Sequence, residues 1–460
     1  MKNIENLNVA IIGGGYAGMA AAVALAGRGI PVTVFESARQ LGGRARGVPL
    51  FTTRKHGNNL PPVQLSPSIG GKSNRPLQGQ NLILDNGQHL LLGCYHQTLR
   101  LIEQVGGNLE QDFLRLPLQL DLHGHFALQA PRLPAPLHLL IALLRAQGLT
   151  WAERLAAARF MLSLRQINFR LARDITVTEL LARYCQSNAL VQKLWEPLCI
   201  AALNTPASIA SAQILLNVLR DSLNQKRADS DMLIPRIDFT ALFPQRAANY
   251  VKKHGGHVLT SCGVEGLLPH EYGFEITTKR GSLFFSHVIC ATQPATAAKL
   301  LQPFAELAPV ITQIDALQHQ PIYTVYLQYP AHIKLPHPML GLHQRYSQWL
   351  FDKGQIAGQH GLIASVISAE GLHQNCSQDE LAQKVIAELA DEFGITDTPS
   401  WHKVIAEKRA TFACTPDLPR PTQQTPLSRL LLAGDYTKGD YPATLEGAVQ
   451  SGLRCAELLG

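Results

Sequence analysis

Three glycines and one acidic residue near the N-terminus have the types and spacing that could hold a dinucleotide. Gly13, Gly15 and Gly18 form a Gly-x-Gly-x-x-Gly run, and Glu36 follows it after the usual interval of about 20 residues. The first glycine permits a tight turn, the second lets a pyrophosphate approach the backbone, and the third lets a helix pack closely on a strand. The Glu36 carboxylate would accept hydrogen bonds from ribose hydroxyls, and its charge disfavours the 2′-phosphate of NADP.

The elements around these residues must form a βαβ unit. Residues 8–12 are apolar and predict a buried strand, an alanine-rich helix follows to about residue 28, and 31–35 predict a second strand. The stretch 9–27 is 19 residues without a charge, which is long enough for a membrane span. Its glycines and the strand that follows argue against that alternative, so we expect no transmembrane helix and no secretion.

A second glycine pair and a Gly-Asp pair at the other end of the chain narrow the choice of dinucleotide. Gly42, Gly43 and Arg44 follow the acid closely, which NAD does not need and which suits FAD. The glycines let the chain pass the pyrophosphate, and the arginine supplies charge. Near the C-terminus, Gly434 and Asp435 follow a predicted strand, and a helix is predicted to begin near residue 443. The first N–H groups of a helix are unpaired, so its start can receive an anion or a polarised oxygen.

Together these motifs (GGGYAG, GGR, AGD, EGA and a final SG) resemble those of the amine-oxidase and carotenoid-desaturase group of flavoproteins. The resemblance implies an FAD cofactor whose linker is bonded by Asp435, and a last helix whose first turn stabilises negative charge on the reduced flavin. It implies further cofactor contacts at Gly87, Gln88, Val264, Glu446, Gly447 and Ala448. Glu446, at the start of a helix, could equally act as a stabilising cap.

The fold class that follows is α/β, with a Rossmann-like FAD-binding domain assembled from discontinuous segments and an inserted α+β substrate domain of mixed or antiparallel sheet plus helices. We expect the FAD-binding domain over 1–115, 232–300 and 405–460, and the substrate domain over 116–231 and 301–404. Within the inserted part the patterns predict a hairpin over 118–128, helices over most of 131–222, strands at 321–329, 347–352, 361–368 and 401–412, and a helix over 377–393.

Three longer stretches are together similar to one family, the hydroxysqualene dehydroxylases or squalene-associated FAD-dependent desaturases: 84–102, 194–223 and 231–244. With the terminal motifs, this resemblance covers nearly the whole chain. It implies reduction of the allylic alcohol hydroxysqualene to squalene in squalene and hopanoid biosynthesis, and it places Trp195 and Asn204 at the substrate pocket. The chain departs from the family at 51–80, an insert rich in Pro, Gly, Asn and Ser that predicts a long mobile loop.

The implied chemistry requires an acid for the leaving oxygen and a dry, elongated apolar pocket. His89, in the stretch DNGQH, is the candidate acid, and Asp85 could orient it. Asp85 could instead cap the turn that follows it, and His89 could be an ordinary core histidine. Tyr441 is a third candidate because the motif brings it near the flavin. For Trp195, plain helix packing is the competing account.

Composition fits a protein that handles an oily ligand. Only 16% of the residues are charged, and the formal net charge is +7. These values predict an oily substrate or peripheral contact with a membrane, and the resemblance implies that the substrate is a long isoprenoid. No dense Lys/Arg run with interleaved aromatics indicates nucleic acid. Residues 131–149 could dip into a membrane face or form a core helix.

Cysteine and histidine usage indicates the compartment and argues against a metal. The eight cysteines are scattered without a Cys-x-x-Cys, which predicts reduced thiols in a cytoplasmic protein, with peripheral attachment at the inner face of the cytoplasmic membrane as an extension. His123-Gly124-His125 lies at a predicted turn without acidic or cysteine partners at a metal-binding spacing, so we expect no metal site.

Other functions share parts of these patterns. A phytoene-type carotenoid desaturase, in which the flavin works in the oxidising direction, has a very similar C-terminal motif. A non-catalytic isoprenoid-binding protein could retain the fold, although the intact glycine motifs argue against it. An amine oxidase is disfavoured because a charged amine does not call for so apolar a second domain. The sequence names no electron donor.

Overall fold

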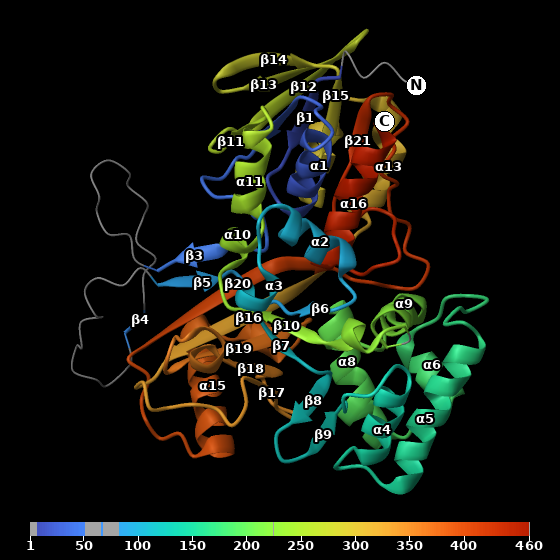
Figure 1. Cartoon of the computed structure of the whole chain (residues 1–460), viewed down its shortest axis with the longest axis vertical. Helices are drawn as coiled ribbons and strands as arrows, with labels where there is room; N and C mark the ends of the chain where they lie inside the picture. The colour runs from blue at the N-terminus through green and yellow to red at the C-terminus, as the bar shows by residue number, and fades with distance from the viewer. Residues whose placement is uncertain (1–6, 51–65, 68–81, 224, 460) are drawn as a thin grey trace.

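The computed structural model describes residues 7–50, 66–67, 82–223 and 225–459, which two large sheets organise (Figure 1). A parallel sheet lies near both chain termini, and a larger, mainly antiparallel sheet lies in the other half of the molecule. The mobile loop predicted over 51–80 falls outside the described residues, except for Ser66–Pro67, which form β4.

The parallel sheet has five strands in the order β11-β2-β1-β15-β21, and each neighbouring pair is parallel. Strands β1, β2 and β21 are buried along their whole length, as expected of a sheet covered on both faces. The strands come from the beginning, middle and end of the chain, which confirms a Rossmann-like sheet built from discontinuous segments. Their bounds are β1 Val9–Ile12, β2 Val32–Phe35, β11 His257–Leu259, β15 His287–Cys290 and β21 Leu430–Leu432.

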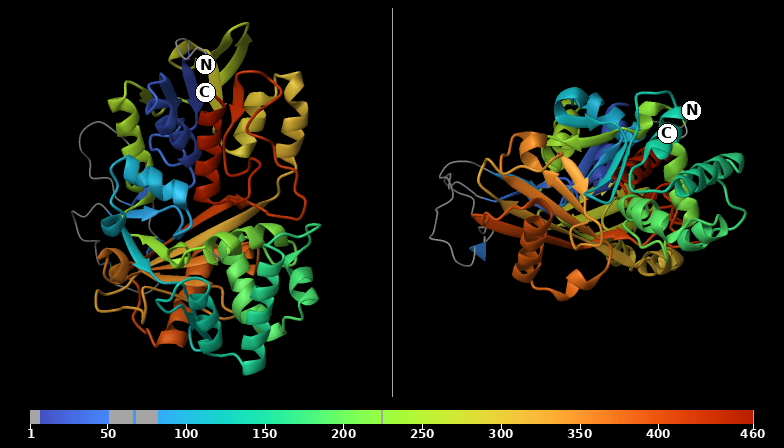
Figure 2. Two further views of the ribbon diagram at one scale, coloured as in Figure 1. Left: turned by 45° about the vertical axis from the view of Figure 1, so that its right-hand side comes forward. Right: turned by 90° about the horizontal axis from the view of Figure 1, so that it is seen from below.

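Two helices from opposite ends of the chain pack together beside this sheet, as the left view in Figure 2 shows. Helix α1 (Tyr16–Ala26) follows β1, and α16 (Leu445–Leu458) closes the described chain. Their backbones approach closely at Gly452, where an added Cβ would lie 2.1 Å from the carbonyl oxygen of Ala17. Only glycine fits at this crossing, so the two ends of the chain are held together by a direct backbone contact.

The larger sheet has the strand order β4-β20-β16-β19-β18-β17-β8-β9. It is antiparallel except at the junction of β17 and β8, which confirms the prediction of a mixed or antiparallel inserted sheet. The hairpin β8–β9 turns at His123-Gly124, as predicted. The bounds are β8 Gln119–Leu122, β9 Phe126–Gln129, β16 His319–Gln328, β17 Met339–Gly341, β18 Trp349–Asp352, β19 Leu362–Ser368 and β20 Trp401–Phe412.

Alternate residues along these strands serve the two faces of the sheet. Tyr323 and Val325 of β16 form an apolar cluster with Leu381 of α15 (Gln378–Phe393). Ile322, which precedes Tyr323 in the strand, points to the opposite face, because successive side chains of a strand alternate. One face is therefore covered by α15, and the other is left for the helices that precede the sheet in the chain.

Those helices occupy most of the segment from 137 to 223, as predicted. Two of them begin with capping boxes, in which Thr150 pairs with Glu153 and Thr176 pairs with Glu179. None of the helices in the described part of the chain is both long and apolar enough to cross a membrane. The bounds are α4 Leu137–Arg145, α5 Trp151–Gln166, α6 Val177–Arg183, α7 Asn188–Leu190, α8 Glu196–Leu203 and α9 Ala212–Leu223.

Three small sheets and several short helices complete the described fold. The sheets have the orders β12-β13-β14, β6-β10-β7 and β3-β5. The domain boundaries given above stay a prediction. The remaining bounds are β3 Gly47–Pro49, β5 Ile83–Asp85, β6 Leu91–Leu92, β7 Phe113–Leu116, β10 Met232–Pro235, β12 Val264–His270, β13 Gly273–Thr278, β14 Gly281–Phe285, α2 His96–Gln104, α3 Leu109–Asp112, α10 Phe239–Leu242, α11 Pro244–Lys253, α12 Pro294–Leu301, α13 Ala308–Asp315 and α14 Lys353–Ala357.

Replacing Gly452 with alanine should lower the thermal stability, because the new methyl group would collide with backbone atoms of α1. Overpacking of this kind costs about 1–3 kcal/mol. Gly439→Ala is the matched control, since no atom lies within 4 Å of the Cβ position there. We expect a lower apparent Tm for Gly452→Ala than for Gly439→Ala in thermal unfolding. Equal melting temperatures would contradict the close crossing of α1 and α16.

Candidate active site

The glycine run after β1 forms a turn in which two glycines are required by the protein itself. A Cβ on Gly13 would lie 2.5 Å from the carbonyl oxygen of Ala291, and a Cβ on Gly18 would lie 2.0 Å from that of Gly13. Gly15 differs, because the nearest atom to its Cβ position is the Cα of Gly43, 4.0 Å away. The space beside Gly15 is therefore left for something other than this chain.

Glu36, at the end of β2, supports the turn. Its Oε2 accepts a hydrogen bond from the N–H of Gly14 at 2.7 Å, and its Oε1 accepts one from Ala38 at 2.8 Å. The carbonyl oxygen of Glu36 accepts a hydrogen bond from the N–H of Cys262. Val264, two residues further along the chain, begins β12. Neither Glu36 nor Val264 lines the large cavity described below, and their roles at the adenosine end stay predictions.

The two ends of the chain meet at an ion pair between Arg44 and Asp435. Arg44 Nη2 lies 2.5 Å from Asp435 Oδ1, and Nη1 donates to the carbonyl oxygen of Ala410 at 2.8 Å. Burial would lower the pKa of Arg44, but the Asp435 carboxylate outweighs it and raises that pKa. The guanidinium is therefore a permanent positive charge at the point where the first and last glycine motifs meet. Gly42 joins the same turn, since its N–H donates to the carbonyl oxygen of Gly14.

A large cavity extends from this ion pair to the helices and the larger sheet. The space between its walls, including the part that opens to solvent, is about 2540 Å³. Residues of both glycine motifs and of the last helix line one end: Gly15, Gly43, Arg44, Gly434, Asp435 and Ala448. The cavity therefore reaches from the Rossmann-like half of the molecule into the other half, so that ligands bound at its two ends could meet.

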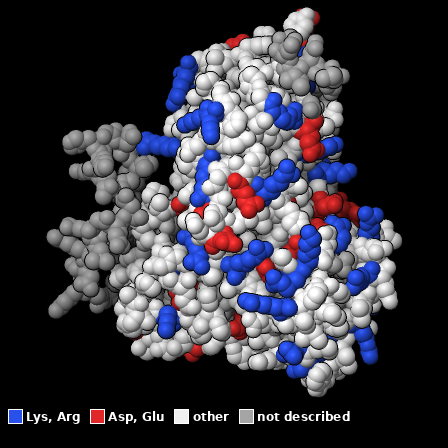
Figure 3. Space-filling model, viewed as in Figure 1, with Lys and Arg blue, Asp and Glu red and all other residues white. Residues whose placement is uncertain are grey.

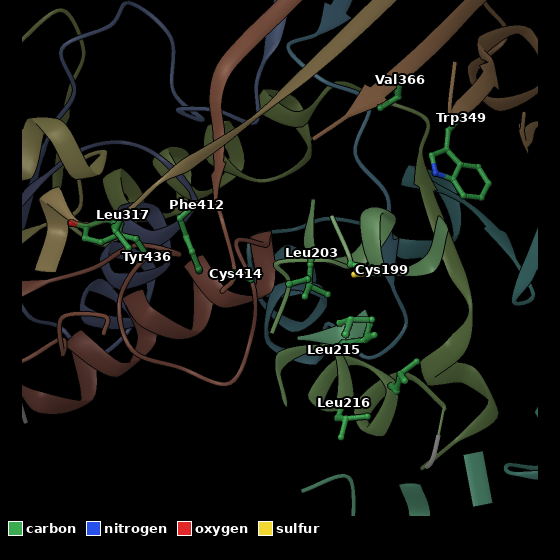
Figure 4. Close-up of a cluster of buried hydrophobic side chains, with 14 of the residues drawn as sticks. Cys199, Leu203, Leu215, Leu216, Leu317, Trp349, Val366, Phe412, Cys414 and Tyr436 are labelled. Carbon is green, nitrogen blue, oxygen red and sulfur yellow. The ribbon is translucent and has the colours of Figure 1, made fainter. Parts of the chain in front are cut away.

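The rest of the cavity wall is mainly apolar. Leu203 of α8 and Leu215 of α9 come from the helices, whereas Trp349 and Val366 come from the cavity-facing side of the larger sheet (Figure 4). Helices and sheet thus enclose a long apolar space whose only charged wall residues, among those described, lie at the polar end.

The loop after β5 contributes polar groups at the junction of the two ends. Gln88 is buried and His89 is half-buried, and their Nε2 atoms, which solvent does not reach, have no hydrogen-bond partner in the described structure. Lys353 Nζ donates to Gln88 Oε1 at 3.2 Å and so fixes that side chain. Burial, with a smaller contribution from the Arg44 charge, lowers the pKa of His89 to about 4. His89 is therefore a neutral imidazole at neutral pH and a poor source of protons.

This polar end fits the FAD that the motifs imply. Unpartnered nitrogens of Gln88 and His89 offer hydrogen-bond donors or acceptors, the space at Gly15 admits a pyrophosphate, and Arg44 offers a positive charge. Thr444, whose hydroxyl accepts from the N–H of Gly447, caps the start of α16 beside the same space. These residues, with Gly43 and Asp435, would hold the cofactor.

Three of the predicted site residues lie away from the cavity wall. Asp85 is buried behind the cavity, where its Oδ1 accepts from the N–H of Phe239, and burial raises its pKa to about 6. Glu446 accepts hydrogen bonds from the N–H and hydroxyl of Thr98 at 2.9 and 2.6 Å, so its carboxylate caps α2. Tyr441 lines a separate polar pocket beside α16. The structure does not bring these side chains to the cavity wall.

The two predicted substrate residues do line the cavity, but both also have structural bonds. Trp195 donates to Gln186 Oε1 at 2.9 Å. Asn204 ends α8 with a left-handed backbone, donates to Thr411 at 2.9 Å and accepts from Ala369 at 2.7 Å. Asn204 thus ties the helices to the larger sheet, a role that the sequence did not indicate.

Glu407 was not among the residues predicted from the sequence, yet among the described residues it is the one carboxylate besides Asp435 on the cavity wall. Glu407 lies on β20 opposite Ile322, which in turn lies opposite Ser368, and all three line the cavity. Its Oε2 is 3.5 Å from Nδ2 of Asn86, whose side chain also donates to the carbonyl oxygen of Arg44. In the sequence, Glu407 is an acidic residue within a long predicted strand. Only the register of the sheet shows that this position faces the cavity.

Comparisons with known proteins agree with a flavin cofactor. The model of the flavin containing amine oxidoreductase family matches residues 64–459, and that of an NAD(P)-binding Rossmann-like domain matches 11–69. The chain is 26% identical to the hydroxysqualene dehydroxylase of Rhodopseudomonas palustris over 98% of both chains. It is 23% identical to the zeta-carotene desaturase of Arabidopsis thaliana, over 98% of this chain and 85% of that one. Cyclohexylamine oxidase from Brevibacterium oxydans has the same fold, with a TM-score of 0.65, 17% identity and coverage of 99% and 98%.

Fold, site and comparisons together define an FAD-dependent oxidoreductase with a Rossmann-like cofactor domain. The chain belongs to the flavin containing amine oxidoreductase family. Its resemblance to the hydroxysqualene dehydroxylases is confirmed over nearly its whole length.

Gly15→Val should give a folded protein that retains little FAD, because the new side chain would occupy space that the protein leaves free for the pyrophosphate. Its backbone φ of −78° is open to any residue. We expect the visible flavin absorbance of the purified variant to fall to a small fraction of the wild-type value, with the secondary structure retained in circular dichroism. Gly18→Val is the contrasting variant, which should fail to fold. A fully yellow Gly15→Val protein would contradict the assigned cofactor position.

Proposed function

We propose that this protein reduces hydroxysqualene to squalene as an FAD-dependent step of squalene and hopanoid biosynthesis. The observation that carries the proposal is the cavity, which joins a polar end that fits FAD to a long apolar space. The relatives named hydroxysqualene dehydroxylase support the substrate, and they are matched along nearly their full length. A squalene-length isoprenoid would need such a space, with its allylic carbon at the polar end.

The reaction breaks an allylic C–O bond. The departing oxygen takes a proton and leaves as water, and the allylic carbon gains a hydride, which bound FAD supplies when reduced. The apolar wall, including Leu215 and Trp349, would exclude bulk water from the delocalised cation. Arg44 and Asp435 would fix the cofactor, so that the allylic carbon is held at one place along the cavity.

Glu407 is our candidate for the proton donor, because it is the carboxyl group of the described cavity wall that no ion pair with Arg44 occupies. It would bind a proton before each turnover and pass it to the departing oxygen. His89 is less suited to that role, since its lowered pKa leaves it neutral. Its unpartnered Nε2 could instead hold the hydroxyl group or the cofactor by a hydrogen bond. Asp85, buried behind the wall, would act only on the loop that carries His89.

We also propose peripheral attachment of the protein at the inner face of the cytoplasmic membrane. An isoprenoid of squalene length dissolves in lipid rather than in water. An enzyme that takes it up from that phase would work at the membrane surface.

The decisive experiment is the anaerobic reaction of photoreduced enzyme with hydroxysqualene. We expect flavin reoxidation and squalene formation in equal amounts. In a parallel reaction, oxidised enzyme is mixed with phytoene. Reduction of the flavin with new double bonds in phytoene, and no reaction with hydroxysqualene, would support a carotenoid desaturase instead. A colourless protein that cannot be reconstituted with FAD would support a binding function.

Glu407→Gln should lower turnover of hydroxysqualene by about 10²-fold or more, as expected for loss of a general acid. The change is nearly isosteric, so FAD content and Tm should stay at wild-type values. Glu407→Asp should restore part of the activity. Wild-type turnover in Glu407→Gln would remove this residue from the mechanism.

His89→Ala should also slow turnover strongly while FAD stays bound, because a polar group at the junction of the two cavity ends is lost. Since the pKa of His89 is about 4, the wild-type pH profile of kcat between pH 6 and 8 should not contain a step that disappears in His89→Ala. Such a step would show that His89 ionises during the reaction. Unchanged turnover with full flavin occupancy would exclude any role.

A further inference from the structure

The outward side of α5 carries a stripe of large apolar residues that nothing in the described structure covers. Trp151, Leu155 and Leu162 are 66%, 45% and 54% exposed. Their spacing of four and seven residues places them on one face of the helix. The opposite face is buried through Ala157, Phe160 and similar residues, so α5 is apolar on two sides.

The preceding segment extends this apolar surface toward α4. Leu133 and Leu137 are 38% and 51% exposed. Leu139 and Leu143 of α4 and Met161 of α5 point inward and line the large cavity. The same two helices thus form part of the cavity wall and part of an exposed apolar surface, which we call the α4–α5 face.

Charge on this segment is strongly one-sided. Residues 131–173 contain seven arginines, no lysine and one acid, Glu153, which gives a formal net charge of +6 (7 − 1) out of +7 for the whole chain. Arg145, Arg159 and Arg165 are exposed, and Arg154 lies over the Trp151 ring, 4.8 Å from its centre. Figure 3 shows Lys and Arg outnumbering Asp and Glu over the lower right of the molecule, where α5 lies in Figure 1.

A second exposed apolar patch lacks this charge. Leu268, Tyr272, Leu283 and Phe284 are 51–65% exposed on the β12-β13-β14 sheet. The residues of that sheet and its turns, 264–285, carry three glutamates and two cations, a formal net charge of −1 (2 − 3). The patch lies at the opposite end of the molecule from α4 and α5 (Figure 1). Of these two apolar surfaces of the described chain, only the α4–α5 face is also positively charged.

We propose that the α4–α5 face docks onto an anionic lipid bilayer and that the isoprenoid enters the cavity from the lipid between these helices. Apolar side chains between cationic ones are the pattern of helices that lie in a membrane interface. Each basic side chain near an anionic surface strengthens binding roughly fivefold. The route of entry rests on the proposed function, whereas the docking of this face does not.

Docking is tested by sedimentation of the holoenzyme with vesicles of neutral lipid alone and of neutral lipid with phosphatidylglycerol. We expect binding to the anionic vesicles, weakened by salt, and at least tenfold weaker binding for the triple variant Trp151→Ser, Leu155→Ser and Leu162→Ser. Leu283→Ser with Phe284→Ser is the matched control and should bind like the wild type. A second variant, Arg145→Gln with Arg159→Gln and Arg165→Gln, leaves the apolar stripe intact and should lose the preference for anionic lipid.

Two results would overturn the proposal: wild-type enzyme that ignores anionic vesicles, or variants of this face that bind like the wild type. Flavin content and Tm serve to check that each variant is folded. If the serine variant does not fold, vesicle binding by the arginine variant tests the proposal. For the entry route, turnover of vesicle-embedded hydroxysqualene should fall in the serine variant, while turnover of detergent-dispersed substrate should not. Wild-type enzyme that binds vesicles but leaves detergent-dispersed hydroxysqualene unchanged would refute the proposed function and leave the docking face in place.

Discussion

The partly buried ion pair between Arg44 and Asp435 is the interaction on which the site depends. It joins residues 391 positions apart and fixes the first glycine motifs against the last. A carboxylate is costly to bury without a partner, and Asp435 is 7% exposed, so the Arg44 guanidinium stabilises Asp435 at this place. The pair also defines the polar end of the cavity, because the walls beyond it come from apolar helices and the cavity-facing side of the larger sheet.

Burial, more than the Arg44 charge, determines which groups near the ion pair can ionise. Burial and, to a smaller extent, Arg44 lower the pKa of His89, whereas burial raises the pKa of Asp85 behind the wall. A site of this kind offers hydrogen bonds in abundance but few protons. Besides Asp435, the one carboxyl group on the described part of the wall is that of Glu407. The electrostatics therefore select among residues that sequence motifs alone treat as equals.

The fold was predictable where local pattern and tertiary requirement agree. The unit at 8–35 could be assigned because few structures besides a βαβ unit need this glycine spacing between apolar runs. The last strand and helix could be assigned in the same way. The hairpin that turns at His123-Gly124 followed from the alternation of apolar and polar residues. The β6-β10-β7 sheet could not be assigned, since strands of two to four residues exist only through their partners. At the site, the glycines, Arg44 and Asp435 were found from motifs. Glu446 shows the limit of that approach, because a carboxylate at a helix start was free to cap a different helix, α2.

In the larger sheet, side chains that shape the cavity alternate with side chains that hold the sheet against α15. Cavity shape and packing stability therefore depend on different residues. At positions such as 322, 366 and 368 a substitution alters the shape of the cavity, while 323, 325 and 367 keep α15 in place. Neighbouring positions in one strand can therefore vary under unrelated selection. Such a protein can acquire a new substrate through changes at every second residue of these strands, while the strand register and the packing of α15 stay the same.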